Sequence, residues 1–245
     1  MDRARPSLRR LAERIVIVTG ASSGIGKATA RLFAEEGARL ILLDRQGDGL
    51  LANLGENGGR AYEVDITDEA KLPGDIDSAA RELGGVDGVI NAAGIMLVGP
   101  TESFSLADWR RTIDVNLTGT FNVVKSALPW LKQRQGATIV NIASAAGLLP
   151  NAPGLAAYAA SKGGVIALTR ALAADLAPDI RVNCVCPGMV MTPMSVGFRS
   201  NVGNYALKRI AEPVEIANAL LFLTSHESSY VTGAALATDG GRSFH

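Results

Sequence analysis

The stretch Thr19-Gly20-Ala21-Ser22-Ser23-Gly24-Ile25-Gly26 constrains this chain most, because its glycines separate an apolar run from a helical pattern. The preceding residues, Ile15-Val16-Ile17-Val18, are all β-branched, which is typical of a strand buried on both faces of a parallel sheet. Ala28, Leu32 and Phe33 then follow helical spacing. A helix that begins at glycines leaves unpaired N–H groups at its positive end, so the turn is predicted to bind an anion, most simply a phosphate.

The glycines are spaced G-x-x-x-G-x-G, which differs from the familiar dinucleotide fingerprint G-x-G-x-x-G. Either pattern alone is weak evidence, because a glycine-rich loop can be only a tight turn. Here a strand precedes the turn, a helix follows it, and an acidic residue ends the next strand-like run. That context favours a dinucleotide site.

The chain has 245 residues, a length that predicts one domain over residues 12–245 preceded by a flexible, arginine-rich arm over residues 1–11. Lys plus Arg and Asp plus Glu number 24 each, so no overall field recruits nucleic acid or an anionic membrane. No apolar run reaches the roughly 18 residues of a membrane span, and no signal-peptide pattern is present. A cytoplasmic protein without a membrane or nucleic-acid partner is therefore expected.

Cys184 and Cys186 are two apart in a strand-like segment, so both point to one face while Val185 points to the other. They are predicted to be buried thiols. With two histidines in the chain, one of them the last residue, no metal-ligand cluster is evident and no metal is expected.

Strand-like runs alternate with helical patterns, which predicts an α/β fold: a doubly wound parallel sheet of about seven strands with helices on both faces. Ligands then bind outside the carboxyl ends of the strands. The predicted strands are Ile15–Thr19, Ala38–Leu43, Ala61–Val64, Gly88–Asn91, Thr138–Ile142, Val182–Cys186 and Ala234–Ala237.

Two connections are predicted to be short or irregular: Gln46–Arg60 holds five glycines, and Lys71–Leu83 is interrupted by Pro73-Gly74. Two long helices are predicted at Leu106–Lys132 and Tyr158–Ala177. The second has small residues on several sides, which fits packing on another subunit and ordinary packing within the chain equally well.

Asp44 lies eighteen residues beyond Gly26, close to the spacing at which an acidic residue accepts hydrogen bonds from an adenosine ribose. A carboxylate there repels a 2′-phosphate, and Ser22 and Ser23 stand where a basic residue could have countered one. NAD is therefore predicted over NADP, although the neighbouring Arg45 keeps NADP open as an alternative. The simpler interpretation is a solvated Asp that closes a strand.

Asp65-Ile66 and Asn91-Ala92-Ala93-Gly94 each follow or end a strand, so they are expected along the same edge of the sheet. Small residues there allow a flat ring to approach the backbone closely. Both segments could equally be ordinary turns.

Four polar residues are candidates for catalysis. Tyr158 and Lys162 are four apart on one helix face, where an ammonium favours the phenolate form of the tyrosine. Ser144 follows the strand Thr138–Ile142 at the ligand-binding edge. Asn116 lies within an apolar helical stretch, where its amide needs a buried partner.

Taken together, these motifs resemble those of the short-chain dehydrogenase/reductase superfamily, over residues 12 to 241. The resemblance is carried by the turn at Gly20, Gly24 and Gly26 and by four further segments: Asn91-Ala92-Ala93-Gly94, Asn116, Ser144 and Tyr158-Ala159-Ala160-Ser161-Lys162, followed by Pro187-Gly188. It implies a Rossmann-type fold, and tetramers are common in the family.

The resemblance also implies roles for these residues. Tyr158 would be the general acid/base, Ser144 would hold the substrate oxygen, Lys162 would grip the nicotinamide ribose, and Asn116 would anchor a water in a proton relay. Pro187, Gly188, Val190 and Thr192 would seat the nicotinamide carboxamide, while Asp239-Gly240-Gly241 resembles the family's C-terminal segment.

The predicted function is the interconversion of a secondary alcohol and a ketone, with hydride transfer to or from nicotinamide. The substrate pocket is expected to be mostly apolar, with few charged groups to hold a phosphate or carboxylate. A mobile lid is one interpretation of residues 195–207, and a static loop is the other. The candidate lining residues are Met96, Leu97, Val98, Ser144, Leu149, Pro150, Met189, Met194, Phe198 and Tyr205.

Two alternatives stay open. One is a 3-oxoacyl-[acyl-carrier-protein] reductase that uses NADPH, although the acidic end of the Tyr158 helix, Asp175-Leu176-Ala177-Pro178-Asp179, argues against a carrier protein. The other is a non-catalytic dinucleotide-binding regulator. Such a protein has no need of all four catalytic positions.

Overall fold

A computed structural model describes residues 9–150, 152–198 and 202–243. For Phe198 it describes the backbone only. Its centre is a seven-stranded, wholly parallel sheet with the strand order β3-β2-β1-β4-β5-β6-β7. The predicted α/β fold and all seven strands are confirmed, with ends that shift by no more than two residues. The strands are β1 (Ile15–Thr19), β2 (Arg39–Asp44), β3 (Gly59–Glu63), β4 (Gly88–Asn91), β5 (Ala137–Ile142), β6 (Ile180–Pro187) and β7 (Ala235–Thr238).

The strand order reverses between β1 and β4, which pair directly, with Ile17 beside Val89. The chain leaves the carboxyl ends of these two strands in opposite directions across the sheet. A crevice opens at such a switch point, and in doubly wound sheets it is where ligands bind.

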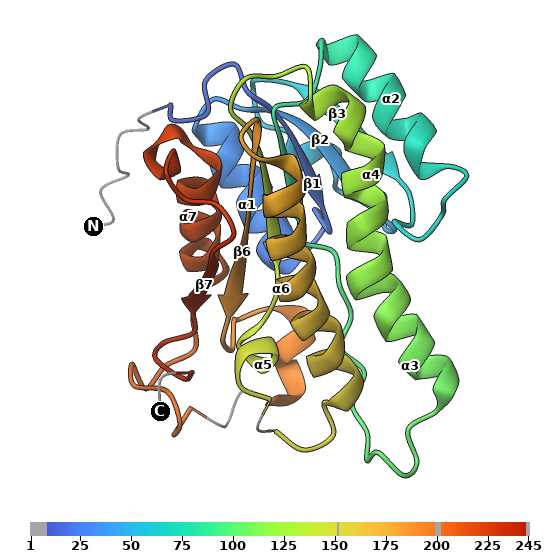
Figure 1. Ribbon diagram of the computed structural model, residues 1–245, viewed down its shortest axis with the longest axis vertical. Coiled ribbons are helices and arrows are strands. Elements are labelled where there is room, and N and C mark those ends of the chain that lie inside the picture. Colours follow the sequence, from blue (N-terminus) through green and yellow to red (C-terminus); the bar gives the residue numbers. More distant parts are fainter. Residues whose placement is uncertain (1–8, 151, 199–201, 244–245) are drawn as a thin grey trace.

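Helices cover both faces of the sheet (Figure 1). On one face α2, α4 and α6 pack on side chains such as Ile17, Ile41 and Ile139; on the other, α1 and α7 pack on Val16, Leu42 and their neighbours. Among the described residues, no helix combines the length and apolar character needed to cross a membrane. The helices are α1 (Gly24–Glu35), α2 (Leu72–Leu83), α3 (Leu106–Ile113), α4 (Gly119–Leu131), α5 (Ala145–Leu148), α6 (Ala156–Leu176) and α7 (Pro213–Thr224).

The two weak connections differ from each other. Between β2 and β3 the only helical turn of the described chain is the 3-10 segment Leu51–Asn53, as the five glycines predict. The expected interruption before β4 is wrong, because α2 is a regular helix of 12 residues. Pro73 lies in its first turn, where a missing N–H costs nothing, and the apolar face of α2 is buried on the sheet.

The predicted helix over Leu106–Lys132 is helical throughout but not uniformly α. A π-helical segment, Asp114–Thr118, joins α3 to α4 and contains the buried Asn116. Single π turns inside α-helices occur often at functional sites, because the extra residue rotates one side chain out of the regular register.

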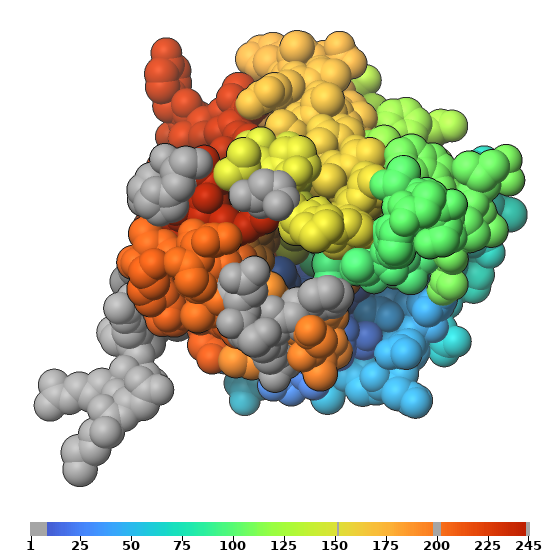
Figure 2. Space-filling model, turned by 90° about the horizontal axis from the view of Figure 1, so that it is seen from below, coloured from blue at the N-terminus to red at the C-terminus, as the bar shows by residue number. Residues whose placement is uncertain are grey.

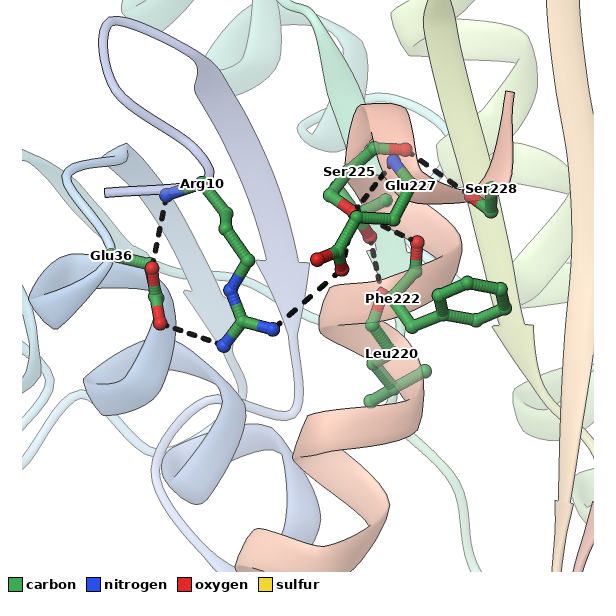
Figure 3. A network of polar contacts seen from close by, with 8 residues as sticks. Arg10, Glu36, Leu220, Phe222, Ser225, Glu227 and Ser228 are labelled. Carbon is green, nitrogen blue, oxygen red and sulfur yellow. Dashed lines mark hydrogen bonds and ion pairs between the residues drawn. The ribbon is translucent and has the colours of Figure 1, made fainter. Parts of the chain in front are cut away.

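The N-terminal boundary lies earlier than predicted. Leu11 is fully buried against the α1 and α7 side of the sheet and Arg10 is half-buried, while Arg9 is exposed and residues 1–8 lie outside the described chain. Arg10 bonds with the Glu36 carboxylate at the end of α1, at 2.7 Å, and reaches Glu227 beyond α7 at 3.7 Å (Figure 3). The Arg10 guanidinium holds the pKa of the Glu36 carboxyl below its usual value, against the effect of burial.

The cysteine prediction is confirmed. Cys184 and Cys186 are buried, unpaired by a disulfide, and share a small apolar cluster with Val165 and Ile166, while Val185 packs on the opposite face. A hydrogen bond with Cys184, together with burial, raises the pKa of the Cys186 thiol, so this sulfur stays protonated and is a poor nucleophile.

Candidate active site

The carboxyl ends of the strands lie at the lower end of the molecule in Figure 1, where α5 and the loops after β4, β5 and β6 gather. Figure 2 looks onto this end and shows segments from the blue, green, yellow and orange parts of the chain meeting around a hollow. Two adjoining cavities of about 460 and 310 Å³ occupy it and share Ile25, Gly94 and Thr192. We call them the catalytic cavity and the nucleotide cavity.

The glycine turn forms one wall of the nucleotide cavity. Gly20 has φ +67°, and a Cβ there would lie 2.8 Å from the Ala93 nitrogen, so a side chain is excluded. The Thr19 hydroxyl accepts hydrogen bonds from the backbone N–H groups of Ala92 and Ala93, which ties the turn to the segment after β4. The Ser23 side chain does not cap α1, and the first turn holds no acidic residue, so this positive helix end suits a phosphate.

Asp44 lies at the end of β2, as predicted, and its carboxylate is fixed in place. One oxygen accepts from the Ser22 backbone and hydroxyl at 2.9 and 2.7 Å, and the other accepts from the Gln46 backbone at 2.9 Å. The oxygen that bonds Ser22 thus already accepts two hydrogen bonds, while the oxygen that bonds Gln46 can accept one more. Both the turn and Asp44 therefore fit the pyrophosphate and ribose of a dinucleotide.

The structure brings together almost all of the predicted cofactor residues. Asn91 is the exception: it is buried in β4, where its amide donates to Asn141, and it lines neither cavity. The nucleotide cavity is lined by Gly20, Ser22, Ser23, Gly24, Ile25, Gly26, Asp44, Arg45, Asp65, Ile66, Ala92, Ala93, Gly94 and Thr192, and the catalytic cavity by Tyr158, Lys162, Pro187, Gly188 and Val190.

Asn116 has the buried partners that its position requires. Its side chain accepts from the Ile95 nitrogen at 2.8 Å and donates to the Ile95 oxygen and to the Ser161 hydroxyl. A Cβ on Gly94 would lie 3.2 Å from the Asn116 oxygen and 3.5 Å from the Lys162 amine. Asn116 therefore stands beside Lys162, directly behind the wall that both cavities share.

Ser144 and Tyr158 face the catalytic cavity from different elements. Ser144 caps α5, where its hydroxyl accepts from the Ala146 nitrogen, and Tyr158 lies in the first turn of α6. Burial raises the pKa of Tyr158 above its ordinary value of 10, and a side-chain hydrogen bond with Ser144 acts in the opposite direction. The protein without ligands thus holds this phenol protonated near neutral pH.

Lys162 is 5 % exposed, and its amine donates to the Ile142 carbonyl at 2.7 Å. Burial lowers the pKa of this amine to about 8. The amine lies 5.9 Å from the centre of the Tyr158 ring, so the shared helix face is confirmed. The expectation that Lys162 lowers the pKa of Tyr158 does not hold in this state, because burial dominates and the opposing contribution comes from Ser144.

The walls of the catalytic cavity are mostly apolar, and six of the predicted pocket residues line it: Met96, Val98, Ser144, Met189, Met194 and Tyr205. Leu97, Leu149 and Pro150 are not part of its described lining. The predicted Phe198 side chain lies outside the described residues. Tyr205 is held by a hydrogen bond from the Met189 nitrogen to its hydroxyl.

Sequence reasoning missed one charged residue of this cavity, Arg242. It belongs to a C-terminal turn that comes back to the active site, and no local motif marks it as a site residue. The expectation of few charged groups therefore needs a correction: Arg242 joins Lys162 among the lining residues.

Comparison with known proteins agrees with this geometry. A family model described as enoyl-(acyl carrier protein) reductase matches residues 20–243. The chain is 40% identical to trans-4-hydroxycyclohexanecarboxylate dehydrogenase of Sinomonas cyclohexanicum, covering 95% of this chain and 93% of the relative. It is 39% identical to 3-oxoacyl-[acyl-carrier-protein] reductase of Thermotoga maritima, and 37% identical to cyclopentanol dehydrogenase of Comamonas testosteroni, each over 95% of this chain and 98% of the relative.

Solved structures agree as well. A 3-ketoacyl-(acyl-carrier-protein) reductase of Brucella melitensis, complexed with NADH, superposes with a TM-score of 0.90 at 32% identity, over 96% of this chain and all of the other. A glucose/ribitol dehydrogenase of the same organism superposes with a TM-score of 0.89 at 37% identity, over 95% of this chain and 98% of the other.

Proposed function

Because the chain belongs to the short-chain dehydrogenase/reductase family and is an oxidoreductase acting on CH–OH groups, we propose that it interconverts an alicyclic secondary alcohol and its ketone with NAD. The observation that carries this proposal is the shared cavity in which the Ser144 hydroxyl, the Tyr158 phenol and the Lys162 amine meet apolar walls. A regulator that only binds dinucleotides would not need this arrangement.

The family binds a nicotinamide dinucleotide, which accepts or supplies the hydride when bound. The glycine turn is proposed to hold the pyrophosphate and Asp44 the adenosine ribose. NAD is favoured because the Asp44 carboxylate, fixed by Ser22 and Gln46, would face a 2′-phosphate with like charge. Arg45, which also lines this cavity, is the one feature that favours NADP.

In the proposed mechanism Tyr158 takes the proton of the substrate hydroxyl during oxidation and returns it during reduction. Ser144 donates to the substrate oxygen as charge develops there. Lys162, anchored on the Ile142 carbonyl, is proposed to grip the nicotinamide ribose. Asn116, bonded to Ile95 and Ser161 behind them, is proposed to anchor a water that returns protons to the site.

The substrate class follows from the cavity and the relatives. The mostly apolar lining suits a compact hydrocarbon skeleton, and Met96, Met189 and Met194 can adjust to its outline. Two relatives are named for reactions of ring alcohols, 4-hydroxycyclohexanecarboxylate and cyclopentanol.

The second candidate is an acyl-carrier-protein reductase, which the name of the Thermotoga maritima relative favours. The end of α6 and the turn after it carry Asp175 and Asp179, whose charge would repel an acidic carrier protein.

The test is an absorbance assay at 340 nm with cyclopentanol, cyclohexanol, 4-hydroxycyclohexanecarboxylate and a 3-oxoacyl thioester, each with NAD(H) and NADP(H). Turnover of the ring alcohols with a preference for NAD supports the proposal. Turnover of the thioester alone, with NADPH, would replace it with the second candidate.

We also propose a cytoplasmic homotetramer. Exposed apolar side chains of α3 and α4, namely Leu106, Trp109 and Phe121, support an interface there. Sedimentation velocity tests it, and a monomer at micromolar concentration would contradict it.

A further inference from the structure

The charged residues that line the described catalytic cavity all carry the same sign of charge. Among its described lining residues Lys162 and Arg242 are cationic, and none is Asp or Glu. Lys162 is already committed to the Ile142 carbonyl and to the catalytic tyrosine. Arg242 has no part in the proton transfer that the other residues of the site carry out.

Arg242 is placed by a turn that is fixed at several points. The Asp239 carboxylate is buried and accepts from the Gly241 and Ser243 nitrogens, one on each side of Arg242. The Arg242 nitrogen itself donates to the Asp239 carbonyl. The backbone that carries this guanidinium is therefore held before any ligand arrives.

The same turn packs on the wall of the catalytic cavity. A Cβ on Gly188 would lie 3.0 Å from the Asp239 backbone, and the Leu207 nitrogen donates to the Gly240 carbonyl. Met189 and Tyr205, which line the cavity, belong to the segments that this turn contacts. The C-terminal turn is thus part of the substrate side of the site.

The location of Arg242 does not suit binding of the dinucleotide phosphates. The glycine turn that suits the pyrophosphate lines the nucleotide cavity, and Arg242 is absent from the described lining of that cavity.

Building on the proposed function, we infer that Arg242 binds a carboxylate on the substrate, so that the preferred substrates are alicyclic hydroxy acids and oxo acids rather than neutral alcohols. A guanidinium keeps its charge and offers five N–H donors, so it can bind a carboxylate through two parallel bonds while keeping its other contacts. Apolar walls strengthen that attraction, because little water screens it.

Catalytic specificity provides the first test. The assay compares 4-hydroxycyclohexanecarboxylate with 4-methylcyclohexanol, which has a methyl group in place of the carboxylate. We expect the unmodified enzyme to prefer the acid at least tenfold in kcat/KM. Arg242→Met should lower kcat/KM for the acid by about 10- to 100-fold, mainly through KM, because a charge-assisted pair is lost. It should change the methyl compound less than threefold, and Arg242→Lys should recover part of the loss for the acid.

Direct binding provides a second test that does not depend on turnover. Calorimetry measures the affinity of the protein saturated with NADH for cyclohexanecarboxylate and for cyclohexanecarboxamide. Arg242→Met should weaken the carboxylate at least tenfold, leave the amide unchanged, and leave NADH affinity unchanged. Arg209→Gln is the matched control, since it removes a nearby cation that lines a different cavity.

The outcomes separate the two claims. Equal losses for the acid and the methyl compound, weaker NADH binding, or no loss for the acid would each overturn the assignment of Arg242. If no alcohol is turned over while the carboxylate still binds through Arg242, the proposed function fails and the carboxylate site stands.

Discussion

The nucleotide cavity and the catalytic cavity lie at the same edge of the sheet but differ in how they hold their ionisable side chains. In the nucleotide cavity, Asp44 accepts three hydrogen bonds from residues within 22 positions of it. In the catalytic cavity, Lys162 is buried and Tyr158 is half-buried, and loss of solvent shifts the pKa of each toward its neutral form. The first is a site for recognition. In the second, only the pKa of the Lys162 amine is brought close to neutral pH, while the Tyr158 phenol is held protonated.

The largest difference between the cavities should appear on removal of the phenol. Tyr158→Phe is expected to lower kcat about 10³-fold or more, because it removes the hydroxyl that is proposed to take the substrate proton. NADH affinity, measured by fluorescence titration, should change less than twofold. Tyr230→Phe, at a fully exposed position, is the control. Substantial residual turnover by Tyr158→Phe would show that another group is the base.

A smaller effect is expected on the pH dependence of stability, because the Lys162 amine is buried. The pKa of Lys162 is lowered from 10.5 to about 8, so between these pH values the unfolded chain binds a proton that the folded chain has released. Stability therefore rises with pH across this window, by about 3 kcal/mol in total for a group as buried as this one.

Lys162→Met removes that pH dependence. Relative to the variant, the unmodified protein should gain unfolding free energy as the pH increases from 8 toward 10.5, measured by urea denaturation. Lys132→Met, at an exposed position, is the control and should leave the pH dependence unchanged. A Lys162→Met difference that stays constant with pH would contradict the shift in pKa.

The smallest effect is expected in the nucleotide cavity. Asp44→Ala should reduce the preference for NAD over NADP, measured as the ratio of kcat/KM values, by about tenfold, because a charge-assisted hydrogen bond and a like-charge repulsion are both lost. Asp48→Ala, four residues further along at an exposed position, should leave the ratio unchanged. Equal kinetics with both nucleotides in the unmodified enzyme would contradict the role of Asp44.

Much of the fold could be read from the chain because its signals are local. Each strand is a short β-branched or apolar run, and the glycine turn needs only its neighbours to define it. The error at Pro73 has a physical reason, since proline breaks a helix in its middle but fits its first turn, and only the packed structure shows where α2 begins.

The residues of the site also fall into those that local sequence signals indicate and those that depend on tertiary contacts. Asp44, Ser144, Tyr158 and Lys162 were found because each stands at a strand end or at helical spacing. Arg242 was missed, and Leu97, Leu149 and Pro150 are absent from the described lining, because contacts between distant segments decide which loop residues line a cavity. The pKa of Tyr158 was also misjudged, since helical spacing gives proximity to Lys162 but does not give burial.

The sequence by itself determined the order of strands and helices, and it was enough to propose an anion site at the glycine turn and the catalytic residue types. Those features depend on backbone geometry within a few residues of one another. Only the tertiary structure decided that Asn116 bonds Ile95 and Ser161 behind the cavity wall, that burial lowers the pKa of Lys162 to about 8, and that Arg242 lines the catalytic cavity. These depend on which distant surfaces meet and how much water they exclude, and no spacing along the chain records that.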